Sequence, residues 1–105
     1  WCAPCREEMP SLDLLNINEK LSNLQVFPIN IGQEDPSKSI KFFKDLKIKN
    51  LKIYHDPSVD LAKKFKLRGV PTTIIINKKG NEFARILGSI DFNDKKFISW
   101  LETFN

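Results

Sequence analysis

The chain has 105 residues, of which 41% are hydrophobic, and this predicts one domain over residues 1–105 with a single apolar core. Lys and Arg number 17 against 13 Asp and Glu, a formal net charge of +4, but the lysines are spread through amphipathic segments. This pattern gives no concentrated basic stripe, so we expect no nucleic-acid binding. No run of 18 apolar residues is present, so no segment of this sequence is predicted to span a membrane.

The first five residues, Trp1-Cys2-Ala3-Pro4-Cys5, contain both cysteines of the chain. Residues at i and i+3 of a helix have Cβ atoms roughly 5–6 Å apart, and disulfides favour Cα separations of about 4.4–6.8 Å. The pair can therefore close and reopen. A purely stabilising cross-link is disfavoured, because closing a loop of about four residues gains only ~2 kcal/mol. The spacing favours redox chemistry.

Metal binding is a weaker alternative. A structural zinc site needs four Cys or His ligands, and the chain offers two cysteines and one histidine, His55. A lone histidine is more often a surface or packing residue than a ligand. We therefore predict no metal site.

The two cysteines are expected to have different roles. Cys2 lies where a helix begins, and the N–H groups and dipole of a helix N-terminus favour the thiolate. We predict Cys2 as the attacking thiol and Cys5, one turn inside, as the resolving thiol. Pro4 falls in the first turn, where a missing N–H costs little. Trp1 either shields the pair or packs beneath it.

Residues 3–23 are predicted to form one helix, kinked at Pro10, because apolar residues recur at helical spacing. Glu8 is three residues after Cys5 and can share the face of the thiols. Its two readings are a solvated acid near the helix start and a group that acts on the cysteines.

The middle of the chain predicts a strand at 25–31, weakened by Pro28, and a helix at 37–49 preceded by the N-cap Asp35. Residues 51–55 form either a short strand or an extended connection. Asp56-Pro57 repeats the N-cap signal and is expected to open a helix that runs through Lys66.

The last third predicts a β-hairpin and a helix. Residues 74–76 are three isoleucines, as in a buried strand, and a turn at 78–81 leads to a return strand at 82–87. Residues 93–104 repeat apolar side chains at helical spacing.

The order of these elements behind Trp-Cys-x-x-Cys resembles the thioredoxin fold. Two stretches, WCAPCREEMPSL at 1–12 and LRGVPTTIIINKKG at 67–80, are similar to the TlpA/ResA group of thiol-disulfide oxidoreductases. The resemblance covers essentially the whole chain. It implies an α/β three-layer sandwich in which helices flank a mixed sheet.

The resemblance also implies roles for residues outside the Cys pair. Val70-Pro71 would be a cis peptide facing Cys2 and Cys5, with the Val70 backbone free to pair with a substrate strand; without the resemblance, a trans proline opening a strand is the simpler reading. Glu8 would tune thiol ionisation and partner contact. Pro4, which would also tune the thiol pKa, and Trp1, which would contact the substrate, complete the predicted site.

Relative to this group, the chain starts at the active-site motif. The central strand that precedes Trp-Cys is therefore expected to be missing, which leaves a gap between the strand segments 25–31 and 72–77. An N-terminal membrane anchor or signal would be missing as well. We accordingly expect an N-terminally truncated segment.

The predicted function is a reductase of disulfides in proteins outside the cytoplasm, anchored or secreted in the full-length protein. The resemblance implies partners in cytochrome c or respiratory copper-site maturation, and a membrane thiol donor that restores the reduced pair. No organic cofactor is needed, and a monomer is expected. The alternatives are a copper-binding assembly factor using Cys2, Cys5 and His55, and a non-catalytic interaction domain with a permanently closed disulfide.

Overall fold

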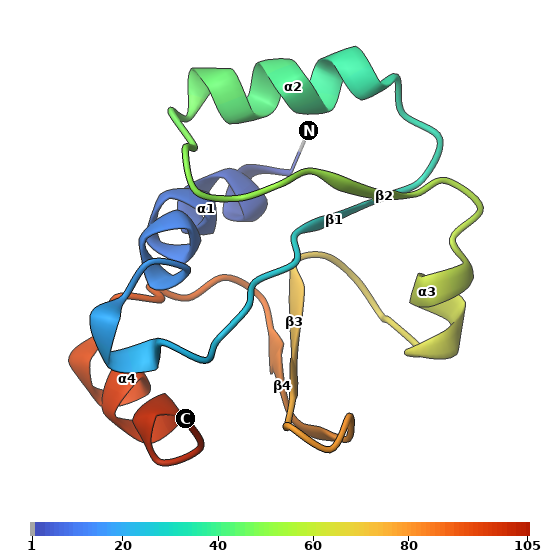
Figure 1. The fold of residues 1–105 in the computed structure, drawn as a ribbon. Helices are drawn as coiled ribbons and strands as arrows, with labels where there is room; N and C mark the ends of the chain where they lie inside the picture. The colour runs from blue at the N-terminus through green and yellow to red at the C-terminus, as the bar shows by residue number, and fades with distance from the viewer. Residues whose placement is uncertain (1) are drawn as a thin grey trace.

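The structure is a computed structural model that describes residues 2–105; Trp1 lies outside the described residues. Helices and strands alternate from β1 to β3, β4 follows β3 directly, and the described chain begins and ends with helices (Figure 1). The elements are α1 (Ala3–Leu15), the 3₁₀ helix η1 (Glu19–Leu21), β1 (Ile29–Ile31), α2 (Pro36–Asp45), β2 (Tyr54–Asp56), α3 (Asp60–Lys64), β3 (Thr72–Ile76), β4 (Glu82–Leu87) and α4 (Lys95–Glu102).

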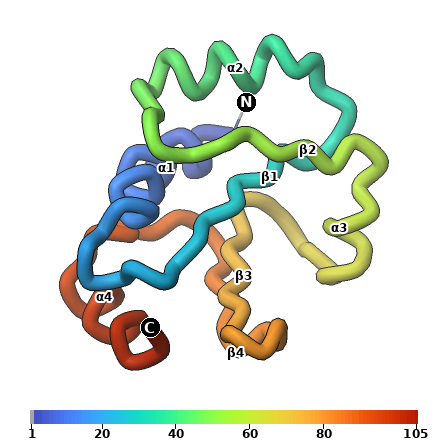
Figure 2. The backbone as a smooth tube through the Cα atoms, in the orientation of Figure 1, coloured from blue at the N-terminus to red at the C-terminus, as the bar shows by residue number. Residues whose placement is uncertain are grey.

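The strands form two separate pairs. β1 pairs in parallel with β2, and β3 pairs antiparallel with β4. Across residues 2–105 no ladder joins the two pairs. One mixed sheet was expected to contain both kinds of pairing. In the structure, the parallel pair and the antiparallel pair are two separate sheets. The separation lies between β1 and β3, the two segments between which a gap was expected. The tube in Figure 2 shows β1 and β2 running between α2 and the β3–β4 hairpin.

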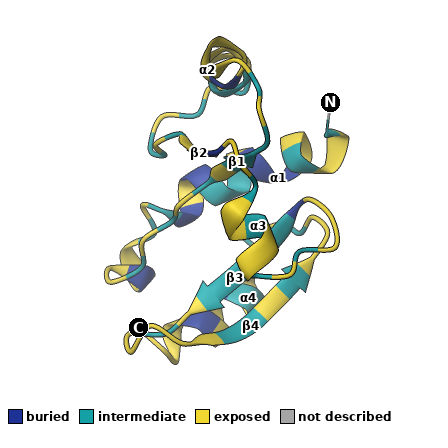
Figure 3. Cartoon of the chain, turned by 90° about the vertical axis from the view of Figure 1, so that its right-hand side faces the viewer, coloured by how far each residue is buried: buried dark blue, intermediate teal, exposed yellow. Residues whose placement is uncertain are grey.

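The helices cover the β3–β4 hairpin in layers. In Figure 1, α1 and α4 lie on one side of the hairpin and α3 lies on the other. Figure 3, viewed from the side of α3, shows that the residues of this helix are mostly exposed. The α/β layering predicted from the sequence is therefore present. Among the described helices, none combines the length and the apolar character that a bilayer crossing requires.

The main core lies where α4 meets the end of α1 and η1. The side chain of Phe92, just before α4, is 1% exposed and is the most deeply buried aromatic group. Apolar side chains removed from water are the main source of stability in such a cluster. The cluster consists of Leu15, Leu21, Phe92, Ile98 and Leu101.

The first helix is shorter than predicted. It continues through Pro10 but ends at Leu15, and η1 follows as a separate turn. Asn16 explains the ending, because its amide donates to the Asn50 carbonyl at 2.8 Å and accepts from the Val26 N–H at 3.1 Å. A side chain that bonds to distant backbone in this way favours a helix end over a helix interior.

The predicted role of Asp56 is also corrected by the structure. It was expected to be the N-cap of a helix beginning at Pro57, but it is the last residue of β2, and α3 begins at Asp60. Its buried carboxylate still accepts from the backbone N–H groups of Asp60 at 3.0 Å and Ala62 at 3.2 Å. Asp56 therefore satisfies the start of α3 from four residues upstream, as a cap would.

The other predicted elements are present with shifted ends. β1 begins only after Pro28, and residues 51–53 are an extended connection that leads into β2. The N-cap assigned to Asp35 is confirmed, since its carboxylate accepts from the Ser37 N–H at 2.9 Å. The hairpin of β3 and β4 and the last helix are confirmed.

Candidate active site

Cys2 and Cys5 form a disulfide at the N-terminus of α1. Their Cα atoms are 5.2 Å apart, inside the range that disulfides favour. Both residues are half-buried, so neither is enclosed in the core. The predicted pairing is confirmed, and the pair is in its oxidised form.

The two cysteines occupy different positions on the helix. Cys2 is the N-cap residue, and its Sγ accepts from the backbone N–H of Cys5 at 3.3 Å. Pro4 lies in the first turn, as predicted, where its missing N–H removes no intrahelical bond. A donor aimed at Sγ of Cys2 would stabilise the thiolate once the disulfide opens. This geometry supports Cys2 as the attacking sulfur.

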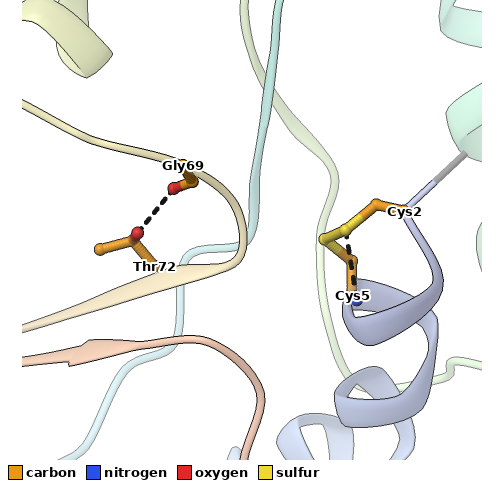
Figure 4. Close-up of a disulfide and its surroundings, with 4 residues drawn as sticks. All are labelled: Cys2, Cys5, Gly69 and Thr72. Atoms are coloured by element: carbon orange, nitrogen blue, oxygen red, sulfur yellow. Dashed lines mark hydrogen bonds between the residues drawn. A yellow bond between two sulfur atoms is a disulfide. The ribbon is translucent and has the colours of Figure 1, made fainter.

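The turn before β3 lies at the same end of the molecule as the disulfide. The Val70–Pro71 peptide bond is cis, as the resemblance implied, so the trans reading is wrong. The hydroxyl of Thr72 donates to the Gly69 carbonyl at 2.7 Å and closes this turn. Figure 4 shows the bend between Gly69 and Thr72 directed toward the two sulfur atoms.

Val70 presents a free edge of backbone in this turn. Its side chain is 41% exposed, whereas Pro71 is buried. Within the described part of the chain, neither the N–H nor the carbonyl of Val70 has a backbone partner. Unpaired backbone groups of this kind can receive an extended peptide as an added strand.

Glu8 lies one turn beyond Cys5 and is 6% exposed, so the reading of a solvated acid is wrong. Burial raises the pKa of its carboxyl group to about 7, and a backbone hydrogen bond with Ile90 partly opposes this shift. In residues 2–105, its Oε2 has no hydrogen-bond partner. A carboxyl group with a pKa near neutrality can exchange protons at physiological pH.

Glu8 also borders a pocket of about 260 Å³ between α1 and the segment after β4. The segment is fixed to the helix, because the Phe92 N–H donates to the Ser11 hydroxyl at 3.0 Å. This segment was not among the predicted site residues. Ser11 and Phe92 are 81 positions apart, and no spacing pattern signals a contact of that range. The pocket is lined by Glu7, Glu8, Ser11, Ser89, Ile90 and Asp91.

His55 does not join the cysteines. It is an exposed residue of β2, and its Nε2 lies 3.2 Å from the Ser39 hydroxyl. Among the described residues, no three His, Cys, Asp or Glu side chains are arranged to hold a metal ion. The three ligands that the copper-binding alternative requires are therefore not brought together.

Comparison with known proteins identifies similar sequences. A family model described as Redoxin matches residues 1–96. The chain is 27% identical over 94 residues to "Thiol-disulfide oxidoreductase ResA" of Geobacillus kaustophilus, which covers 90% of this chain and 53% of that protein. It is 27% identical over 90 residues to "Thiol:disulfide interchange protein HelX" of Rhodobacter capsulatus, covering 86% of this chain and 48% of that protein. The chain thus spans about half the length of these curated relatives.

Solved structures show the same fold. A putative thiol:disulfide interchange protein DsbE from Chlorobium tepidum superimposes with a TM-score of 0.80 at 20% identity, over 97% of this chain and 72% of that one. StoA from Bacillus subtilis superimposes with a TM-score of 0.77 at 20% identity, over 99% and 74%. At this level of identity the likeness concerns the fold alone, which is thioredoxin-like.

Proposed function

This chain belongs to the Redoxin family, and we propose that it is a thiol-disulfide oxidoreductase that reduces disulfides in partner proteins. The observation that carries the proposal is the Cys2–Cys5 disulfide on a helix N-terminus, with the turn at Gly69–Thr72 directed toward it. The names of its relatives, which are thiol-disulfide oxidoreductases and an interchange protein, support the same reaction class. We propose that residues 1–105 act as one domain.

The reaction proceeds in two exchange steps. In the reduced protein, the Cys2 thiolate attacks one sulfur of the partner disulfide, forms a mixed disulfide and releases the first partner thiolate. The Cys5 thiolate then attacks Sγ of Cys2, which forms the Cys2–Cys5 disulfide and releases the second partner thiolate. Two electrons pass to the partner, and its two thiolates take up protons. Because the two sulfurs carry both electrons, the proposal includes no organic cofactor and no metal.

Other residues support these steps. The free backbone edge at Val70, beside Pro71, would pair with an extended segment of the partner. Glu8 would supply or accept a proton near Cys5, since burial places its pKa near 7. Trp1 was predicted to contact the partner and lies outside the described residues. Pro4 contributes by fixing the first turn of α1.

We further propose where the protein acts and with which partners. It would act outside the cytoplasm, as a monomer, on disulfide-containing proteins of cytochrome c or respiratory copper-site maturation. A membrane thiol donor would return the Cys2–Cys5 pair to the reduced state by the reverse pair of exchanges.

The test is to trap the mixed disulfide. In a Cys5→Ser protein the resolving thiol is absent, so a partner that reacts with Cys2 stays attached and is identified by mass spectrometry after non-reducing electrophoresis. Cys2→Ser, which lacks the attacking thiol, is the matched control and should trap far less partner protein. If Cys5→Ser traps no protein although Cys2 reacts with an alkylating reagent, the reductase proposal fails.

A further inference from the structure

We infer that Ser11 is a positioning residue for disulfide exchange, acting through the segment Gly88–Phe92. Ser11 fixes one end of this segment to α1, and the other end is bonded to Pro71. The segment thereby holds the partner-binding turn opposite the disulfide. This inference rests on the proposed function, because it concerns how the same site is assembled.

The Ser11 hydroxyl makes two hydrogen bonds. It accepts from the backbone N–H of Phe92 at 3.0 Å and donates to the carbonyl of Glu8 at 2.9 Å. A hydroxyl has one hydrogen to donate and two lone pairs to accept with, so both bonds can form at once. The Phe92 side chain is 1% exposed and anchors the same end of the segment in the core.

The other end of the segment is bonded to the turn. The N–H of Gly88 donates to the carbonyl of Pro71 at 2.9 Å. Five residues therefore span from a bond with Pro71 to a bond with Ser11, and a chain of five residues has a reach of at most about 16–18 Å. Between these two ends, Ile90 and the buried Glu8 of α1 line the same pocket, so the segment runs along the helix.

The hairpin also meets α1 by apolar packing, since Ile75 of β3 and Ile86 of β4 pack against the core cluster that contains Leu15. Apolar contact is non-directional, so the hydrogen-bonded segment matters for the position of the turn. The two strand pairs are not joined by a ladder in residues 2–105, so β3 is not tied through a sheet to the elements around α1. A reacting group displaced by about 1 Å can lose a factor of ~100 in rate. A segment bonded at both ends restricts such displacement.

The inference is tested with Ser11→Ala, which removes the hydroxyl and leaves the Phe92 N–H without its acceptor. In the reduced protein, the KM for a disulfide-containing peptide should rise roughly fivefold to tenfold, the loss typical of one hydrogen bond with its unpaired donor. The rate constant with a small disulfide reagent, which does not need the turn, should be unchanged. Ser11→Thr keeps the hydroxyl and should retain the wild-type KM.

Ser99→Ala is the matched control, because Ser99 is exposed on α4 and its hydroxyl makes no hydrogen bond within residues 2–105. An unchanged KM in Ser11→Ala, or an equal loss with peptide and small reagent, would overturn the inference. A Ser11→Ala protein that does not fold would overturn it too, by making Ser11 a residue of general stability. If the wild type reduces neither substrate, the proposed function itself fails, which is a different result.

Discussion

The carboxylate of Asp13 on α1 accepts the backbone N–H of Asn50 at 2.7 Å, across 37 positions of sequence. The same carboxylate accepts from the Lys49 N–H at 3.2 Å and from the Asn50 side-chain amide at 3.3 Å. Asp13 is 6% exposed, so these bonds replace the water that the charged group loses on folding. Asp13 thereby fixes the connection between α2 and β2 to the helix that carries the disulfide.

Replacing Asp13 by alanine should therefore destabilise the protein. The backbone N–H groups of Lys49 and Asn50 would lose their charged acceptor in partly buried hydrogen bonds, and we expect the free energy of unfolding to fall by roughly 2–3 kcal/mol. Urea denaturation followed by circular dichroism measures this change. Asp45→Ala is the matched control, since Asp45 is an exposed acid at the end of α2, and it should change stability by less than about 0.5 kcal/mol. Equal effects of the two substitutions would contradict the role given to Asp13.

Much of the fold follows from local sequence signals. The three isoleucines of β3 and the turn after them predicted the hairpin, and Asp35 predicted the start of α2. The failures occur where a side chain bonds to a distant segment. Asn16 ends α1 through bonds to Asn50 and Val26, and sequence spacing alone signals neither contact.

The features of the candidate site also divide into those that local spacing predicted and those that depend on distant segments. Cys2 and Cys5 are three residues apart, so their spacing alone predicted that they could pair. The cis bond before Pro71 came from family resemblance, because a Val-Pro pair in isolation favours trans. The burial of Glu8 depends on the Ser89–Asp91 segment, which is more than 80 positions away and had no signal in the sequence.

Glu8 should make stability depend on pH. Burial raises the pKa of Glu8 from its ordinary value of 4.5 to about 7, so between these values the folded protein binds the proton more tightly than the unfolded chain does. The buried Glu8 carboxylate therefore lowers the free energy of unfolding. This destabilisation is absent below pH 4.5, grows as the pH rises toward 7 and is constant above pH 7. At about 1.4 kcal/mol per pKa unit, the loss is at most ~3.5 kcal/mol.

Glu8→Gln should remove this dependence, because the amide stays neutral and can still accept from the Ile90 backbone. Relative to the wild type, it should be more stable at pH 8 by up to ~3.5 kcal/mol and closely similar at pH 4.5. Unfolding curves at a series of pH values give the comparison. Glu7→Gln, a change at the exposed neighbour, is the control. If the stability of the wild type changed with pH as little as that of Glu8→Gln, Glu8 would not be the source of the pH dependence.

The free backbone of Val70 predicts how a peptide substrate binds. If the peptide adds a strand at Val70, then N-methylation of the one peptide N–H that faces the Val70 carbonyl removes a hydrogen bond. We expect the KM of the reduced protein for that peptide to rise about fivefold to tenfold. N-methylation at the adjacent residue, whose N–H points away from the edge, is the control. Equal effects at both positions would argue against strand pairing.

The position of Cys2 on the helix predicts both its reactivity and the redox potential of the pair. The N–H of Cys5 points at Sγ of Cys2, whereas Cys5 lies a turn inside the helix, so after reduction Cys2 should be alkylated first by iodoacetamide. Stabilising the Cys2 thiolate also stabilises the reduced form, which raises the reduction potential. Structural disulfides usually lie below about −300 mV, and we expect Cys2–Cys5 to lie above that value in equilibrium with glutathione. A potential well below −300 mV, with Cys2 and Cys5 alkylated at equal rates, would instead support a permanently closed disulfide in a non-catalytic domain.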